Sequence, residues 1–262
     1  MIGCGTLCRQ SGKALHPLEH LDLYNRLAAW WPLISPPELY REEARRIAHI
    51  VDTHARCRQR SILILGGGGG CLASWLRRRR NVTIADISLP MLQVSRRLNP
   101  GCIHVLGDMR TLRLPRRYAA VVIPDSVSYL RTAADIVAAA RTALWHCALG
   151  GVAVFQPEYV AETFREDRYS AQASDGNSGL TLTRTTSRHP GRENGYYSRF
   201  EYVLTSQNGT EQWDEIHEFG LAAIADWLSI LERSGFRDVQ ALRYERADGL
   251  PEQVSFFGVR RE

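Results

Sequence analysis

Five consecutive glycines at positions 66–70 directly follow the apolar segment Ser61–Leu65. A short apolar run with β-branched members that ends at glycine is typical of a strand buried on both faces. Glycine lacks a Cβ and adopts backbone angles that other residues avoid, so its N–H groups can approach a ligand closely. Leu72, Trp75 and Leu76 then recur at helical spacing. The order of strand, glycine turn and helix predicts the nucleotide-type pocket of a doubly wound α/β fold.

A second apolar segment, Asn81–Asp86, ends on a carboxylate 16 positions after Gly70. A carboxylate at the tip of the second strand of such a fold is placed to accept hydrogen bonds from both hydroxyls of a ribose. The alternation continues, with strands expected at 61–65, 82–86, 102–106, 118–124 and 151–156 and helices at 70–80, 88–98 and 132–148. This pattern predicts a parallel sheet with right-handed crossovers and ligands at the carboxyl ends of its strands.

Two helices are expected before this core. Apolar residues recur in three- and four-residue steps over 16–31, which predicts an amphipathic helix after a disordered segment 1–15. Three prolines then interrupt the pattern. Ser35 is expected to cap a second helix that has Pro36 at its first position.

The chain changes character after the core. Residues 170–179 are small and polar, which predicts a flexible loop. Alternating segments at 180–186, 197–204 and 212–219 predict three antiparallel strands. Asn208 followed by Gly209 is a hairpin signal between the last two. These strands are expected to form a β platform above the sheet.

The C-terminal segment is expected to return to the core sheet. Helix 221–234 and strands 237–246 and 253–260 would complete seven strands. We therefore expect four parts: a tail with lid helices (1–59), a Rossmann-like core (60–157), the inserted β platform (158–219) and the last part of the core sheet (220–262).

Five segments resemble, in the right order, the motifs of class I S-adenosylmethionine (SAM)-dependent methyltransferases. They are the glycine turn 66–70 and the segments 86–92, 107–110, 118–130 and 150–155. The resemblance implies a mostly parallel, doubly wound sheet that binds SAM. Segments around Tyr24 and Tyr40 are similar to the small-molecule branch of this family, in which N-terminal helices fold over the cofactor as a lid. Members of that branch methylate amino sugars, glycine derivatives and other natural-product precursors.

The resemblance also implies the cofactor contacts. Asp86 would hold the ribose, and Asp108 would meet the adenine amino group. Ile64 stands where the family carries an acid, so backbone amides of the glycine turn would hold the cofactor carboxylate. The expected cofactor-binding residues are Gly66, Gly67, Gly68, Gly70, Asp86, Ile87, Met91, Asp108, Met109, Asp125 and Tyr40.

Methyl transfer from a sulfonium is an in-line displacement, for which a protein supplies positioning, desolvation and a base. Asp125 follows the fourth strand, where it would take a proton from the acceptor or anchor a cationic one; a cap or a cofactor contact is the alternative. Strand alternation places His217 on the same face as Glu215, and an imidazole suits proton abstraction. Tyr24 would orient the substrate from the lid, or simply pack there. Asp125, His217 and Tyr24 are therefore the candidate catalytic residues.

Three functional hypotheses remain, and the ordered motifs, the lid helices and the β platform favour the first. The preferred one is a methyltransferase acting on an N or O atom of a polar small molecule in secondary metabolism. The second is a protein that binds SAM as a regulator or for a reaction other than methylation, which the replaced acid at Ile64 keeps open. The third, a nucleic-acid methyltransferase, draws on the net charge of +5 and the arginines at 77–80. These arginines are better explained as a solvated helix end, and no Asn/Asp-Pro-Pro-aromatic tetrad follows the fourth strand.

The remaining expectations concern metals, partners and location. The six cysteines are scattered and lack the paired spacing of a zinc site, so we expect no metal. No apolar stretch approaches the 18 residues of a membrane span. We expect a cytoplasmic monomer or homodimer with a small-molecule substrate, and neither nucleic acid nor membrane as a partner.

Overall fold

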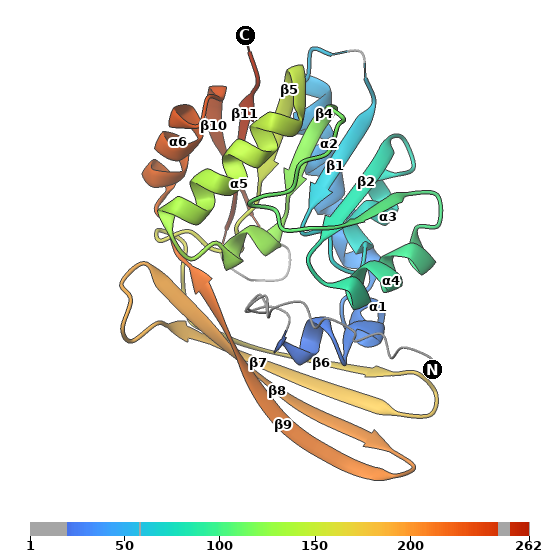
Figure 1. Cartoon of the computed structure of the whole chain (residues 1–262). Helices are drawn as coiled ribbons and strands as arrows, with labels where there is room; N and C mark the ends of the chain where they lie inside the picture. The colour runs from blue at the N-terminus through green and yellow to red at the C-terminus, as the bar shows by residue number, and fades with distance from the viewer. Residues whose placement is uncertain (1–19, 58, 246–251, 262) are drawn as a thin grey trace, which may run out of the picture.

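The structure is a computed structural model and describes residues 20–57, 59–245 and 252–261 (Figure 1). The expected disordered segment 1–15 lies outside the described residues. Two sheets dominate the molecule, with a set of short N-terminal turns between them (Figure 1).

The larger sheet has seven strands in the order β10-β11-β5-β4-β1-β2-β3. They are β1 (Ser61–Leu65), β2 (Asn81–Asp86), β3 (Ile103–Leu106), β4 (Tyr118–Ile123), β5 (Cys147–Phe155), β10 (Arg237–Tyr244) and β11 (Gln253–Val259). β1 is an interior strand and pairs in parallel with β2 and β4. β11 is antiparallel to both of its neighbours. The predicted mostly parallel sheet of seven strands is confirmed.

Helices cover both faces of this sheet, as a doubly wound fold requires. One face carries α5 (Ala133–His146) and α6 (Ile224–Arg233). The other carries α2 (Arg41–His54), α3 (Cys71–Leu76) and α4 (Leu89–Leu98). Successive side chains of a strand point to opposite faces, so Leu63 enters the first core and Ile62 and Ile64 enter the second. β1 is consequently apolar along its interior and fully buried.

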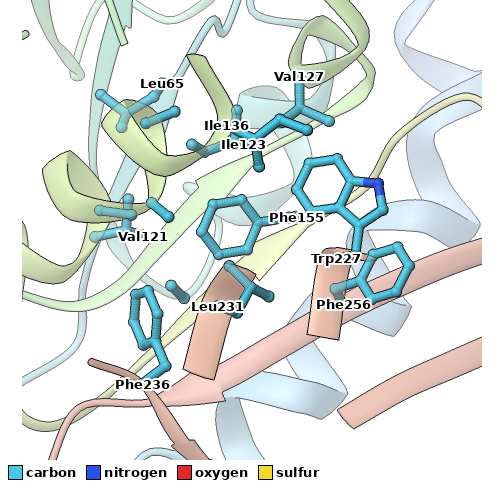
Figure 2. Packing of buried hydrophobic residues seen from close by; sticks show 14 of the residues in the cluster. Leu65, Val121, Ile123, Val127, Ile136, Phe155, Trp227, Leu231, Phe236 and Phe256 are labelled. Atoms are coloured by element: carbon cyan, nitrogen blue, oxygen red, sulfur yellow. The ribbon is translucent and has the colours of Figure 1, made fainter. Parts of the chain in front are cut away.

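The first core is rich in aromatic rings (Figure 2). Phe155 of β5 lies with its ring centroid 6.1 Å from Trp227 and 6.1 Å from Phe236, and Trp227 stacks on Phe256 at 5.3 Å. These contacts fix α6 and β11 against β5. The antiparallel end of the sheet is thus held by side chains as well as by strand pairing.

The platform is a four-stranded antiparallel sheet, not the three strands expected. Its strands, in spatial order, are β6 (Asp167–Ser174), β7 (Gly179–Arg188), β8 (Gly195–Ser206) and β9 (Gly209–Gly220). The prediction of a flexible loop over 170–179 is wrong for its first half, which belongs to β6. Ala171 and Ala173 pack against the platform's apolar cluster. Hydrogen bonding to β7 orders this segment, which its small polar residues alone do not indicate. The turn that remains is held by Asp175, which accepts hydrogen bonds from the N–H groups of Asn177 and Ser178.

The predicted single helix over 16–31 is also wrong in its described part. The chain instead forms η2 (Asp22–Tyr24), η3 (Ala28–Trp30) and α1 (Trp31–Ile34). These short turns place Leu23, Leu27 and Ile34 in one cluster with Leu182 and Phe200 of the platform. Packing on the platform therefore outweighs the helical periodicity. The turns join the two sheets.

The second N-terminal helix is preceded by η4 (Pro37–Tyr40) and runs as α2 from Arg41. The Ser35 side chain does not cap it. Its hydroxyl lies 2.8 Å from the hydroxyl of Tyr40 and hydrogen-bonds there instead. Pro32, Pro36 and Pro37 restrict the backbone of this segment. Because α2 begins only at Arg41, Ser35 lies too far before it to cap its first N–H groups. The four-part division of the chain stays a prediction.

Candidate active site

A cavity of about 1010 Å³ lies at the carboxyl ends of the parallel strands. Its wall is made by the glycine turn, the loops after β2, β3 and β4, the N-terminal turns, and side chains of the platform. Ligands of doubly wound folds bind at this edge of the sheet. Tyr24, Asp125 and His217, which come from three separate parts of the chain, all line this one cavity.

The glycine turn bends sharply beside the tip of β2. Gly66, Gly68 and Gly70 have positive φ values of 73°, 51° and 81°, which side chains disfavour. The Asp86 carboxylate accepts hydrogen bonds from the Gly68 N–H at 2.7 Å and from the Ser88 N–H at 2.8 Å. Burial raises the pKa of Asp86, and these backbone bonds oppose that rise. The side chain therefore faces the bend, and a carboxylate has about four lone-pair positions, so acceptor capacity remains for ribose hydroxyls.

The turn fits an adenosyl cofactor with an amino-acid arm. Gly66, Gly67 and Gly68 line the cavity with bare backbone. A Cβ on Gly66 would lie 2.2 Å from the Ser126 hydroxyl oxygen, so the space beside the turn admits only glycine. The Ser126 hydroxyl is itself buried and has no hydrogen-bond partner among the described residues. A ligand in the cavity would supply that partner. Asp86, Ser126 and the turn's N–H groups would thus hold the cofactor's polar atoms.

Most of the other expected cofactor-binding residues also line the cavity: Ile87, Met91, Asp108, Met109, Asp125 and Tyr40. Gly70 is not among the described lining residues. It begins α3, where a Cβ would meet the side chains of Ser95 and Asn99. Ile64 is fully buried in the second core, away from the cavity. Which of these residues touch the cofactor stays a prediction.

Asp108 is tied to its neighbour. The Arg110 guanidinium donates to both Asp108 carboxylate oxygens at 2.7–3.1 Å and to Asp135 at 3.0 Å. These ion pairs hold the loop after β3 against the start of α5. The part of the cavity wall that this loop forms is therefore held in place by α5.

A continuous chain of hydrogen bonds crosses the platform side of the cavity. The Tyr24 hydroxyl lies 2.7 Å from that of Tyr129, which lies 2.6 Å from Nδ1 of His217. Nε2 of His217 lies 2.9 Å from Oε1 of Glu215. Glu215 also accepts hydrogen bonds from the Tyr202 hydroxyl at 2.6 Å and from the backbone N–H of Asp22 at 2.6 Å. The platform and the N-terminal turns are joined through these groups.

The chemistry of these groups fixes the direction of the chain. Burial works to raise the pKa of Glu215, but hydrogen bonds from His217 and Tyr202 outweigh it and lower that pKa. An ionised Glu215 accepts the proton on Nε2 of His217, which leaves Nδ1 as an acceptor for Tyr129. Burial raises the pKa of Tyr24 and of Tyr129, so both remain phenols and donate in turn. Tyr24 lines the cavity, and because its hydroxyl donates to Tyr129, its oxygen keeps acceptor capacity.

Glu158 and Arg184 were not singled out from the sequence. Both line the cavity, and the Arg184 guanidinium pairs with Glu158 and with Asp167, the latter at 3.2 Å. The Tyr159 hydroxyl donates to Asp167 at 2.6 Å. Glu158 lies three residues after the motif segment 150–155 at the end of β5. Its position in the sequence could therefore have indicated a residue of the cavity wall. Arg184 lies within an alternating strand and carries no comparable signal.

The fold and this site define a class I SAM-dependent methyltransferase. No family model matches the chain. It is 30% identical over 186 residues to the dTDP-3-amino-3,6-dideoxy-alpha-D-glucopyranose N,N-dimethyltransferase of Streptomyces fradiae, covering 70% of this chain and 71% of the relative. It is 27% identical over 227 residues to the dTDP-3-amino-3,4,6-trideoxy-alpha-D-glucopyranose N,N-dimethyltransferase of Streptomyces venezuelae, covering 85% and 92%.

Solved structures agree on the fold. The sugar N-methyltransferase KedS8 from Streptoalloteichus aligns over 100% of both chains with a TM-score of 0.73 and 21% identity. Streptomyces venezuelae DesVI aligns over 84% of this chain and 92% of its own, with a TM-score of 0.71 and 23% identity. The chain belongs to the small-molecule branch of the class I SAM-dependent methyltransferases. It is an enzyme that uses SAM to methylate a polar small molecule.

The comparisons confirm the predicted family, fold, cofactor and reaction class. In the part of the chain that the structure describes, no helix is both long enough and apolar enough to cross a membrane. The cytoplasmic location, the absence of nucleic-acid and membrane partners, and the monomeric or dimeric state stay predictions.

Proposed function

We propose that the enzyme transfers the methyl group to an amine nitrogen, and that the acceptor is an amino sugar or a close amino-sugar analogue. The observation that carries this proposal is the hydrogen-bonded chain from Tyr24 through Tyr129 and His217 to Glu215. An amine is protonated at neutral pH and must lose a proton before its lone pair can attack. A chain that accepts protons at the cavity wall and passes them inward suits that requirement.

SAM supplies a methyl group on a sulfonium, which is activated for displacement by a nucleophile. The protein's own residues position the acceptor and take its proton. The Tyr24 oxygen accepts an N–H of the acceptor, while the Tyr24 and Tyr129 hydroxyl protons each move one place towards Nδ1 of His217. The resulting imidazolium is stabilised by Glu215, whose carboxylate lies 2.9 Å from Nε2.

The names of the two sequence relatives support the same substrate class, since both are dimethyltransferases of 3-amino sugars. Asp125 and Glu158 also line the cavity and provide negative charge for an ammonium group. The N-terminal turns line the cavity and pack on the platform, an arrangement that would limit the access of water to the transfer.

The experiment compares matched acceptors with methyl-labelled SAM. A 3-amino-3-deoxy sugar and the same sugar with a hydroxyl at that carbon are incubated with the enzyme, and the products are located by mass spectrometry. We expect label on the amine and none on the hydroxyl sugar. Methylation of oxygen in both acceptors would overturn the proposal.

A further inference from the structure

We propose that the acceptor amine enters this cavity on a molecule without a nucleoside diphosphate, in contrast to the dTDP-linked sugars in the names of its relatives. This inference rests on the proposed amine methylation and specifies what the amine is attached to. The structure favours a cationic or neutral amine, such as an amino sugar in glycosidic linkage.

The cavity wall carries an excess of negative charge. Eight Asp or Glu residues line it against four arginines, Arg46, Arg110, Arg131 and Arg184. His217 is held by the carboxylate of Glu215, which lies just behind the wall. A diphosphate brings two further negative charges beside this wall, where Coulomb repulsion is screened less than in water. An ammonium group instead finds opposite charge there.

The arginines that line the cavity are committed to protein groups. Arg110 uses Nε and both terminal nitrogens on Asp108 and Asp135. Arg184 lies between Glu158 and Asp167, and Arg131 donates to Glu218 at 2.6 Å.

The fourth arginine is engaged differently. Arg46 stacks at 4.9 Å on the ring of Tyr244 and lies 3.4 Å from the Gln253 side-chain oxygen. Diphosphates are typically held by arginines whose paired N–H groups face the ligand. Among the described residues, no lining arginine is arranged for that task.

Two of the lining acids lie near the hydrogen-bonded chain. Asp125 belongs to the same short helical turn as Tyr129. The backbone N–H of Glu158 donates to the hydroxyl of Ser128, next to Tyr129. After burial, the charges of Asp125 and Glu158 are among the causes that raise the pKa of Tyr24. Both carboxylates therefore act on the hydroxyl that would receive the acceptor's proton. Their field stabilises an incoming ammonium and opposes an anion attached to the same sugar.

The platform side of the cavity offers apolar contact in place of cations. Leu182 and Phe200 line it from two neighbouring strands, together with Ala171 and Tyr169 of β6. Tyr169 is 46% exposed. Such a surface suits an aglycone or sugar ring with an apolar face.

The test measures binding of thymidine 5′-diphosphate by calorimetry to the full chain saturated with S-adenosylhomocysteine. We expect no binding tighter than millimolar. Micromolar binding that competes with an amine acceptor would overturn the inference, whether or not methyl transfer is detected. Failure of the proposed function would instead appear as absence of methylated amine with every acceptor.

Turnover provides a second readout. The same 3-amino sugar is offered as a methyl glycoside and as its thymidine diphosphate conjugate. We expect kcat/KM at least tenfold higher for the glycoside, with a KM that rises with salt because screening weakens the attraction. A preference for the conjugate would overturn the inference and leave amine methylation standing.

A variant tests the charge argument directly. Glu158→Gln releases Arg184 from one carboxylate, so thymidine diphosphate should bind at least tenfold more tightly than to the wild type. Glu211→Gln is the matched control, because Glu211 lies outside the cavity lining in an exposed pair with Arg26. Equal affinity of the wild type and a folded Glu158→Gln variant for thymidine diphosphate would contradict the charge argument.

Discussion

Nδ1 of His217, on the platform, lies 2.6 Å from the hydroxyl of Tyr129, which ends the short helix η5 (Asp125–Tyr129) after β4. This contact links the four-stranded platform to the carboxyl ends of the parallel strands. It aligns an imidazole from one sheet with a phenol that follows a strand of the other. Because Glu215 accepts the opposite ring proton, the contact also sets which imidazole nitrogen is free to accept.

Tyr129→Phe should break the proton path while leaving the ring in place. We expect kcat to fall by about 10²- to 10⁴-fold, the usual contribution of general base catalysis, with a small change in KM. The remaining activity should rise more steeply with pH, because solvent then removes the proton. Tyr197→Phe is the control, since Tyr197 alternates to the opposite face of β8. Wild-type kcat in the Tyr129 variant would rule out the path.

Glu215→Gln should alter the pH dependence of stability. The pKa of Glu215 is lowered in the folded state from an ordinary value of 4.5. A lowered pKa stabilises the fold at pH values above the ordinary one, and that contribution is lost as the pH falls through the folded value. The variant should therefore be less stable than the wild type at neutral pH, and the gap should narrow on acidification below about 4.5.

Urea denaturation across pH measures this gap. Glu211→Gln on the same strand serves as the control, because the Glu211 side chain is 61% exposed. A constant difference between the Glu215 variant and the wild type from neutral to acid pH would show that this carboxylate is not linked to folding.

Gly70→Ala should destabilise the fold. Gly70 has a φ of 81°, and a Cβ there would lie 2.3 Å from the Ser95 hydroxyl oxygen. The left-handed conformation alone costs about 1–2 kcal/mol for a residue with a side chain. Gly101→Ala has open space and should change the free energy of unfolding by less than about 0.5 kcal/mol. Equal stability of the two variants would mean that the turn is more plastic than its geometry indicates.

Ile64→Asp restores the acid of the family pattern at the sequence level. Because Ile64 is fully buried in the core, we expect a loss of stability without a gain in SAM affinity. Ile64→Val should cost about 0.5–1.5 kcal/mol and keep affinity unchanged. Thermal unfolding and SAM titration of both variants measure these effects. Tighter SAM binding by Ile64→Asp would show that this position reaches the cofactor.

The sequence predicted the structure well where neighbouring residues decide it. The apolar run of β1, the glycines that allow a sharp turn, and Asp86 at the end of the next strand are all local features, so their arrangement could be predicted. Alternation in β9 correctly placed Glu215 and His217 on one face. These features depend on residues close together in the chain.

The errors arose where distant packing decides the local structure. Leu23 and Leu27 have helical spacing, yet contacts with the platform favour short 3₁₀ turns. The second half of β6, residues 170–174, has only small or polar side chains and is ordered by pairing with β7. The link between Tyr24 and Tyr129 joins residues 105 positions apart, so no local pattern indicates it. Arg184 was missed for the same reason, since its partners lie on other segments.

Calorimetric titration of SAM into the wild type and Asp86→Ala tests the central claim most directly, namely that the glycine turn and Asp86 together hold the cofactor. Asp226→Ala on the exposed surface of α6 is the control. We predict that Asp86→Ala loses at least about 1–3 kcal/mol of binding free energy, because the ribose hydroxyls lose a charged partner, and that the control loses none. SAM binding to a folded Asp86→Ala variant with wild-type affinity would contradict the account.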